Sequence, residues 1–425
     1  MLVQNFDTLA TTPERKIVLE IINAGLEAIQ PDQVIVQNIT LVNNILKLQN
    51  NEFDLSSYHN VFLIGFGKGS AGISKLIENI LGEKLTSGYV IDTTPETFNK
   101  LEFTLGTHPL PSKENFEFTQ KILSTLYNLS PQDLILVVIC GGGSAMLVSP
   151  INGVTLEDKI NINKALLKSG ADIKEMNTVR KHLSRVKGGG LAKALFPARV
   201  VNLIFSDVAG NDLSFIASGP TVKDETTLDV AKEIIKKYQL EATLSQLIPK
   251  LKETPKDEKY FKNVSNILML SNLTALHAME EKAKEYNLNV QIFSDHFQSD
   301  AKEAGTTLLA QTQPNSVLLA GGETTVKVLG AGKGGRNQEV VLASLSHISN
   351  DTIIASFASD GFDNTENAGA IGDAKTQNTA ATQQLDQNTF ISNNDSYTFF
   401  EKTGDGIKTG RLPSNVSDLF VILKK

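Results

Sequence analysis

The chain has a single cysteine, no tryptophan and no long apolar run among its 425 residues. One cysteine excludes an intramolecular disulfide and suits the cytosol. No apolar stretch approaches the roughly 20 residues that a membrane-spanning helix needs. The amino terminus lacks a basic segment followed by an apolar one, so no signal peptide is expected. These absences predict a cytoplasmic protein without a membrane segment.

An excess of positive charge is also lacking. The formal net charge is −7, from 40 Lys and Arg residues against 47 Asp and Glu residues. A broad basic face for nucleic acid is therefore not expected, although local basic clusters are compatible with a small acidic substrate. The chain is 41% hydrophobic and 20% charged, which is typical of a globular protein. Its length favours two or three domains.

Apolar segments that alternate with amphipathic ones are abundant. Strands are expected at 60–67, 87–94, 133–139, 198–207, 316–322, 351–360 and 417–423. Strands that alternate with helices indicate an α/β fold with parallel sheets. Residues 241–262 are polar and lysine-rich and interrupt this pattern. We therefore predict two α/β domains with mostly parallel sheets that flank a cleft: a larger Rossmann-like domain at 1–245 and a smaller α/β domain at 246–425.

One glycine motif favours a nicotinamide cofactor. Gly67, Gly69 and Gly72 follow an expected strand with the spacing G-x-G-x-x-G, and Asp92 lies about twenty residues further on, as in dinucleotide-binding folds. Lys68 weakens this interpretation, because that fingerprint usually has a small or apolar residue there. The chain also contains other anion-binding loops, which a dehydrogenase would not need. A tight strand–helix turn without a ligand is a further alternative.

A second glycine-rich segment suits phosphate. Gly141, Gly142 and Gly143, with Ser144 behind them, end the apolar strand expected at 133–139. Parallel sheets bind ligands at the C-terminal edge of their strands. Successive backbone N–H groups at the start of a helix bind anions there. This loop is therefore a candidate phosphate-binding loop.

A third glycine-rich segment presents a cation near acidic and hydroxyl groups. Glu323 and Thr324 follow the strand expected at 316–322, and a glycine-rich turn leads to Arg336. A loop cation near carboxylate and hydroxyl groups is what phosphoryl transfer uses. The alternative for Arg336 is a solvated loop charge.

Basic residues gather at 177–195. At helical spacing Arg180 and Lys187 share one face, and Lys181 and Arg185 share another. One such face could bind a carboxylate or phosphate, and the alternative is an exposed basic helix. His182 could act as a general base, although a hydrogen-bonded structural histidine is more common.

Two acidic residues follow apolar strands. Asp207 ends the strand expected at 198–207, and Asp360 ends the one at 351–360. An acid at such a position can bind Mg²⁺ or accept the proton of a substrate hydroxyl. Residues 358–370 lack the spacing and terminal Glu of a calcium-binding EF-hand.

The order of these segments resembles the glycerate 2-kinases, whose older members carry the name hydroxypyruvate reductase. The matching stretches run from residue 60 to the carboxyl terminus and include "GFGKGSAG", "THPLPSKEN", "ICGGGSAML", "NTVRKHLS", "GGETTVKV", "GGRNQE" and "SDGFDNTENAGA". The resemblance implies a two-domain α/β kinase. It would transfer a phosphoryl group from ATP, with Mg²⁺, to the 2-hydroxyl of D-glycerate, giving 2-phosphoglycerate.

The resemblance also implies roles for individual residues. It places the family's essential lysine at Lys68 and its essential arginine at Arg336, and acidic motif residues at Asp207, Glu323 and Asp360. We expect the following assignments: Lys68, Arg336 and Asp207 catalytic; Gly141, Gly142, Gly143, Ser144, Glu323 and Thr324 at the nucleotide; Lys68, Arg180, Lys181 and His182 at the substrate; Asp207 and Asp360 at the metal. Arg411 departs from the family pattern and could alter the preferred acceptor. An NAD(P)H-dependent hydroxypyruvate reductase and a non-catalytic nucleotide sensor stay as alternatives.

Overall fold

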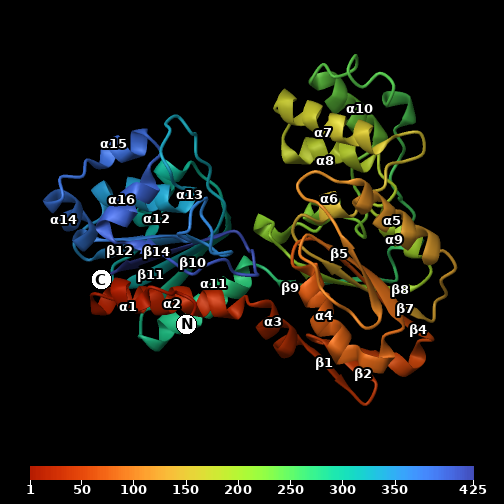
Figure 1. Ribbon diagram of the computed structural model, residues 1–425, viewed down its shortest axis with the longest axis horizontal. Coiled ribbons are helices and arrows are strands. Elements are labelled where there is room, and N and C mark those ends of the chain that lie inside the picture. Colours follow the sequence, from red (N-terminus) through yellow and green to blue (C-terminus); the bar gives the residue numbers. More distant parts are fainter. The chain divides into compact units, whose positions relative to one another are not determined.

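The computed structural model describes residues 1–425, apart from the side chain of Ala209. The chain divides into two compact units, and neither is continuous in sequence (Figure 1). The terminal unit comprises residues 1–34, 207–210 and 270–425, and therefore holds both ends of the chain. The central unit comprises residues 35–206 and 211–269.

A six-stranded sheet forms the centre of the central unit, in the order β6-β5-β4-β7-β8-β9. Its strands are β4 (Asn60–Phe66), β5 (Ser87–Asp92), β6 (Leu101–Leu105), β7 (Asp133–Ile139), β8 (Arg199–Phe205) and β9 (Val264–Leu270). The neighbouring pairs from β6 to β8 are parallel. Every residue of β7 is buried, as expected for a strand covered on both faces. The strand order reverses between β4 and β7, which is where such sheets bind ligands.

Helices of the central unit form two groups. Those that connect the sheet strands are α4 (Ser70–Leu81), α5 (Lys113–Thr125), α6 (Gly143–Met146) and α9 (Gly190–Leu195). A separate group comprises α7 (Leu156–Ser169), α8 (Ile173–Lys181) and α10 (Leu228–Lys237). Their apolar faces meet around Ile162, Val179 and Ile234. Capping boxes at Thr155 and Asp172 begin α7 and α8 by satisfying their first backbone N–H groups.

A small antiparallel sheet lies near the start of the central unit. It contains β1 (Ile39–Val42), β2 (Ile45–Leu48) and β3 (Asn51–Asp54). Helix α3 (Pro31–Asn38) precedes it, and its residues are divided between the two units.

The terminal unit has its own six-stranded sheet, in the order β10-β11-β15-β12-β13-β14. Its strands are β10 (Asn289–Phe297), β11 (Ser316–Gly322), β12 (Thr352–Ala358), β13 (Gly369–Gly372), β14 (Gly406–Ile407) and β15 (Asp418–Lys424). β10 and β11 are parallel, whereas the other four neighbouring pairs are antiparallel. The last strand, β15, is inserted between β11 and β12.

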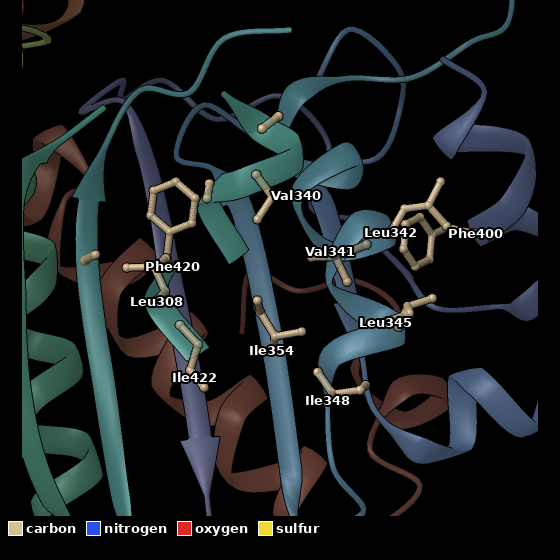
Figure 2. Close-up of a cluster of buried hydrophobic side chains, with 14 of the residues drawn as sticks. Leu308, Val340, Val341, Leu342, Leu345, Ile348, Ile354, Phe400, Phe420 and Ile422 are labelled. Carbon is tan, nitrogen blue, oxygen red and sulfur yellow. The ribbon is translucent and has the colours of Figure 1, made fainter. Parts of the chain in front are cut away.

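Helices pack against this sheet in two sets. The first set contains α1 (Phe6–Leu9), α2 (Pro13–Ala28) and α11 (Asn272–Glu285); α2 contacts α11, β12 and β15. The second set contains α12 (Ala301–Gln311), α13 (Arg336–Ser344), α14 (Ala374–Thr382), α15 (Gln387–Ser392) and α16 (Ser396–Thr403). Figure 2 shows Phe420 of β15 and Ile354 of β12 in one core with Val340 of α13 and Leu345 just after it. This core holds the start of α13, and with it Arg336, against the sheet.

The amino-terminal helices belong to the terminal unit because Arg15 anchors them there. Arg15 of α2 is 1% exposed. Its Nε and Nη2 donate to the two carboxylate oxygens of Asp373 at 2.6 and 2.7 Å, and its Nη1 donates to Asp405 at 2.7 Å. The two acids lie 358 and 390 residues further along the chain. A paired arginine of this kind fixes the helix in one orientation.

The two units correct the domain limits expected at 1–245 and 246–425. Residues 1–34 and 207–210 belong with the carboxyl-terminal part, and the last boundary between the two units falls at 269–270 and not at 245–246. The α/β class and the Rossmann-like order of the central sheet agree with the sequence prediction, but the terminal sheet is mixed and not mostly parallel. An apolar run does not encode the direction in which its strand enters a sheet. Among the described residues, no helix combines the length and apolar character that crossing a membrane requires.

Candidate active site

Two glycine loops meet at the reversal point of the central sheet. The loop after β4 contains Gly67 and Lys68, and the loop after β7 begins at Cys140 and Gly141. The Cys140 N–H donates to the Phe66 carbonyl at 3.0 Å, and the Lys68 N–H donates to the Gly141 carbonyl at 2.8 Å. Gly67 has a φ of +110°, and a Cβ there would lie 2.4 Å from the Cys140 carbonyl oxygen. Glycine thus lets the loops touch, and the exposed Lys68 side chain stands beside the second loop.

A histidine that the sequence analysis did not single out joins these loops. Gly142 has a φ of +74°, and a Cβ there would lie 2.7 Å from the His108 ring. Partial burial and the Lys68 ammonium both lower the pKa of His108, which favours the neutral imidazole. Its signal in the sequence is the stretch "THPLPSKEN", which resembles the glycerate 2-kinases but carries no role by spacing alone.

The phosphate-binding potential of the second loop lies partly in a side chain. Two of its N–H groups serve the turn itself: Gly143 donates to Cys140 at 3.2 Å and Ala145 to Gly142 at 3.0 Å. Ser144, in contrast, presents a half-buried hydroxyl that lies 2.9 Å from the Ser218 hydroxyl. The groups of this loop that could contact a phosphate are therefore the other backbone N–H groups and the Ser144 hydroxyl.

The basic residues 180–182, at the end of α8, have different partners in the structure. Arg180 reaches the loop, with its Nη2 3.4 Å from Ser144 Oγ. Lys181 is buried and pairs with Asp224 at 3.2 Å. His182 is fully buried, with Nδ1 2.8 Å from the Thr178 carbonyl and Nε2 3.2 Å from Glu253. Consecutive helical residues point in directions about 100° apart, so Arg180 reaches the glycine loop while Lys181 and His182 contact acids elsewhere in the unit.

A cavity of about 610 Å³ in the terminal unit is lined by four more of the predicted residues. Arg336, the first residue of α13, lines it together with Glu323, Thr324 and Asp360. The Arg336 guanidinium binds Glu323 and pairs its Nε with Asp418 Oδ2 at 2.6 Å. Its side chain is 34% exposed, so one side of the guanidinium stays accessible from the cavity. Burial works to lower the pKa of Arg336, but the two carboxylates more than offset it and leave it raised.

Two buried acids that the sequence analysis did not assign hold the start of α13. Asp363 accepts hydrogen bonds from the backbone N–H groups of Asn337 and Gln338 at 3.1 and 2.9 Å. Burial raises the pKa of Asp363 and raises that of Asp418 to about 7. The Asn337 amide also donates to Asp418 at 2.9 Å. These contacts fix the first turn of α13 and so orient Arg336. Asp363 and Asp418 come from the 358–370 loop and from β15, which lie near α13 only in the folded chain.

The two acids predicted to bind a metal both belong to the terminal unit. The Asp207 carbonyl accepts a hydrogen bond from Ser417 Oγ at 2.9 Å, and Ser417 and Asp360 line the same cavity. Among the described residues, no group of three or more His, Cys, Asp or Glu side chains forms a ready metal centre. Mg²⁺ commonly takes only one or two carboxylates and completes its shell with phosphate oxygens and water. The assignment of Asp207 and Asp360 to a metal stays a prediction.

The structure gives the dinucleotide fingerprint a structural role. Asp92, which would bind a ribose in that interpretation, is 1% exposed and accepts a hydrogen bond from the Ala71 N–H at 2.9 Å. It is therefore occupied at the start of α4. A Cβ at Gly72, the third glycine, would meet no atom within 4 Å, so this glycine does not serve a close approach of helix and strand.

Together the fold and these loops define a two-unit α/β protein with glycine-rich loops and accessible cationic side chains in both units. A family described as "Domain of unknown function (DUF4147)" matches residues 17–252, and the MOFRL family matches residues 316–418. The D-glycerate 2-kinase of Thermotoga maritima is 33% identical over 96% of this chain and 97% of its own. The crystal structure of a Thermotoga maritima glycerate kinase superimposes with a TM-score of 0.86 at 33% identity, covering 96% of this chain and 99% of that one.

The chain belongs to the glycerate kinase family and is accordingly a kinase. A relative from Agrobacterium vitis named putative hydroxypyruvate reductase is 37% identical over 85% of this chain and 86% of its own. That name does not favour a reductase, because the kinases match over nearly the whole chain and Asp92 is occupied. The predictions of an α/β kinase and of its family are confirmed.

Proposed function

We propose that the chain phosphorylates the 2-hydroxyl of D-glycerate with ATP and Mg²⁺ and releases 2-phosphoglycerate and ADP. The observation that carries this proposal is the near full-length similarity to a D-glycerate 2-kinase. It is supported by anion-binding loops at the reversal point of the central sheet and by an arginine-lined cavity in the terminal unit. The oxygen of the 2-hydroxyl attacks the γ-phosphorus, and the bond from that phosphorus to the β–γ bridging oxygen breaks.

Roles for the side chains follow from their chemistry. Lys68 and Arg336 stabilise the charge on the transferring phosphoryl group, for which a positioned arginine is well suited. Asp207 either accepts the proton of the 2-hydroxyl or binds the metal together with Asp360. Mg²⁺, when bound, neutralises charge on the phosphate oxygens. Glu323 and Thr324 contact the nucleotide in this proposal, and the buried Thr324 hydroxyl has no hydrogen-bond partner among the described residues.

Phosphorus NMR of the products tests the reaction itself. Purified protein incubated with ATP, Mg²⁺ and D-glycerate should give the resonance of 2-phosphoglycerate and not that of the 3-phosphate. A parallel sample with hydroxypyruvate and NADH, without ATP, should show no NADH oxidation. NADH oxidation without formation of 2-phosphoglycerate would favour the reductase over the kinase. ATP binding without any turnover would favour a non-catalytic nucleotide sensor.

The loop at Gly142 can be tested separately from the reaction. Gly142→Val should weaken ATP binding at least tenfold, because a side chain at a φ of +74° would be strained and would push against His108. Gly72→Ala is the matched control, since a Cβ at Gly72 meets no atom within 4 Å. Calorimetric titration with ATP measures both. Parental affinity in a folded Gly142→Val variant would remove this loop from the nucleotide site.

The cytoplasmic location and the lack of nucleic-acid partners stay predictions from composition.

A further inference from the structure

A cluster of basic side chains in the central unit lacks negative charge. We define the basic cluster as Lys159, Arg180 and Lys187, which come from α7, α8 and the segment after α8. The described residues place no carboxylate in an ion pair with any of the three. The charges that act on Lys187 are those of Lys159, Arg180 and Lys181, all of them cations. Buried cations of one sign in one place are normally neutralised by an acid or by a bound anion.

Lys159 is the least satisfied member of the basic cluster. It is 3% exposed, and its Nζ has no hydrogen-bond partner among the described residues. Burial, together with the charge of Arg180, lowers the pKa of Lys159 to about 7. Its amine therefore stabilises no other element of the fold through a hydrogen bond, and the sequence assigned it no role. The amine is available to a ligand.

Lys187 and Arg180 converge on Ser144 at the end of the second glycine loop. Lys187, 1% exposed, donates from Nζ to the Ser144 carbonyl at 2.7 Å and to Ser144 Oγ at 2.8 Å. Arg180 approaches the same hydroxyl at 3.4 Å, while its buried Nε has no partner among the described residues. Two unused N–H donors, on Arg180 and Lys159, therefore lie within one cationic cluster.

Two polar side chains, Ser218 and Asn177, lie next to Ser144 and the basic cluster. Ser218 Oγ lies 2.9 Å from Ser144 Oγ and 3.2 Å from the Asn177 side-chain oxygen. Ser218 and its neighbour Ala217 have φ values of +63° and +50°, a backbone conformation that costs energy in residues other than glycine. Such strain is concentrated at functional sites, where it places a particular group.

Two acids of the surrounding elements, Asp224 and Glu253, already have partners. Asp224 pairs with Lys181 and accepts from the Thr226 hydroxyl at 2.8 Å. Glu253 contacts His182 and Lys256. Neither carboxylate neutralises the basic cluster.

We propose that Lys159, Arg180 and Lys187, with the Ser144 hydroxyl, bind one oxyanion, a carboxylate or phosphate, that supplies the missing negative charge. The inference deepens the proposed function and rests on it for the source of the anion: the carboxylate of glycerate or a phosphate of ATP. Lys159, which carries no role in the sequence-derived site, becomes an anion-binding residue. The amine takes up a proton when the anion arrives, because the new charge favours its ammonium form.

The test compares Lys159→Met with Lys164→Met, an exposed lysine of the same helix. Calorimetric titrations use D-glycerate alone and a non-hydrolysable ATP analogue alone, at pH 8 in buffers of different ionisation enthalpy. Lys159→Met should weaken one of the two ligands roughly 10- to 100-fold, the usual worth of a hydrogen bond to a charged group. Burial also lowers the pKa of Lys187, so this amine can contribute to the proton uptake. The parent and Lys164→Met should therefore take up more protons with that ligand than Lys159→Met does. Which ligand loses affinity identifies the source of the anion.

Thermal unfolding separates a binding role from a structural one. Lys159→Met should raise the Tm of the protein without ligand, because methionine fills a similar volume and removes a buried amine without a partner. A lowered Tm with unchanged binding of both ligands and unchanged proton uptake would overturn the proposal.

A sodium phosphate titration distinguishes failure of the site from failure of the proposed function. If the parent binds neither D-glycerate nor the ATP analogue but binds phosphate through Lys159, the site stands and the proposed substrates fall. If phosphate also fails to bind, the oxyanion site falls.

Discussion

Arg15 in the terminal unit and Lys159 in the central unit are both buried cations on helices, but only Arg15 has acidic partners. Asp373 and Asp405 accept hydrogen bonds from all three nitrogens of the Arg15 guanidinium, and the Thr376 hydroxyl accepts one more. Lys159 has no hydrogen-bond partner among the described residues. A buried cation that is paired with acids of the same protein holds its helix in place. A buried cation without a partner lowers the stability of the fold and can bind an anion. Burial alone therefore does not distinguish a structural cation from a binding one; its partners do.

Arg336 sharpens this comparison because it is paired and yet accessible. It contacts Glu323 and Asp418, like a structural arginine, but its side chain is 34% exposed in the cavity. We expect Arg336→Met to lower kcat by about 10³- to 10⁵-fold, as for arginines that stabilise phosphoryl transfer elsewhere. Arg336→Lys should not restore it, because an ammonium lacks the planar fork. Steady-state kinetics with D-glycerate and ATP measure both variants.

The same kinetics include Lys68→Met and the double variant. Each single variant should lose most of kcat, and the double variant should lose far less than the product of the two losses, since residues that act on one group are not additive. Near-parental kcat in either single variant would contradict the assigned roles.

Arg15→Met should instead show its effect in stability. Removing the guanidinium leaves Asp373 and Asp405 buried without their cation, which costs about 3–5 kcal/mol in the free energy of unfolding. Urea unfolding followed by circular dichroism measures it. Lys16→Met is the matched control, because the adjacent Lys16 is exposed and forms only a surface pair with Glu20 at 3.8 Å; its loss should stay below about 1 kcal/mol. Equal effects of the two substitutions would break the contrast drawn above.

The smallest effect is expected in the pH dependence that Lys159 confers. Its pKa is about 7 in the folded protein and 10.5 in the ordinary lysine, so the unfolded chain binds more protons between these values. Stability therefore rises with pH across this window, as the penalty of a buried ammonium disappears. The difference in unfolding free energy between the parent and Lys159→Met should shift in favour of the parent by on the order of 3 kcal/mol from about pH 7 to about pH 10. A difference that is constant with pH would show that Lys159 is not buried as an amine.

The sequence by itself determined the local elements and the chemistry at their ends. Apolar runs such as 133–139 form buried strands, and the glycines behind them are loops at the sheet edge, because both follow from neighbouring residues. The family was also readable from the order of short motifs. Arg180 was singled out on its helix, and the structure places it beside Ser144.

Only the tertiary structure decided which distant groups meet. Arg15 lies 358 residues before Asp373, the nearer of its two carboxylates, so no local pattern could assign residues 1–34 to the terminal unit. β15 runs antiparallel to β11 and β12, which depends on how these strands pack in the sheet. Lys181 is unavailable to a substrate because it pairs with Asp224, 43 residues further along the chain. Lys159 belongs to an ordinary amphipathic helix in the sequence, and its unpaired burial arises only when α7 packs. Pairing and burial are properties of the folded neighbourhood, and the sequence specifies them only through the whole fold.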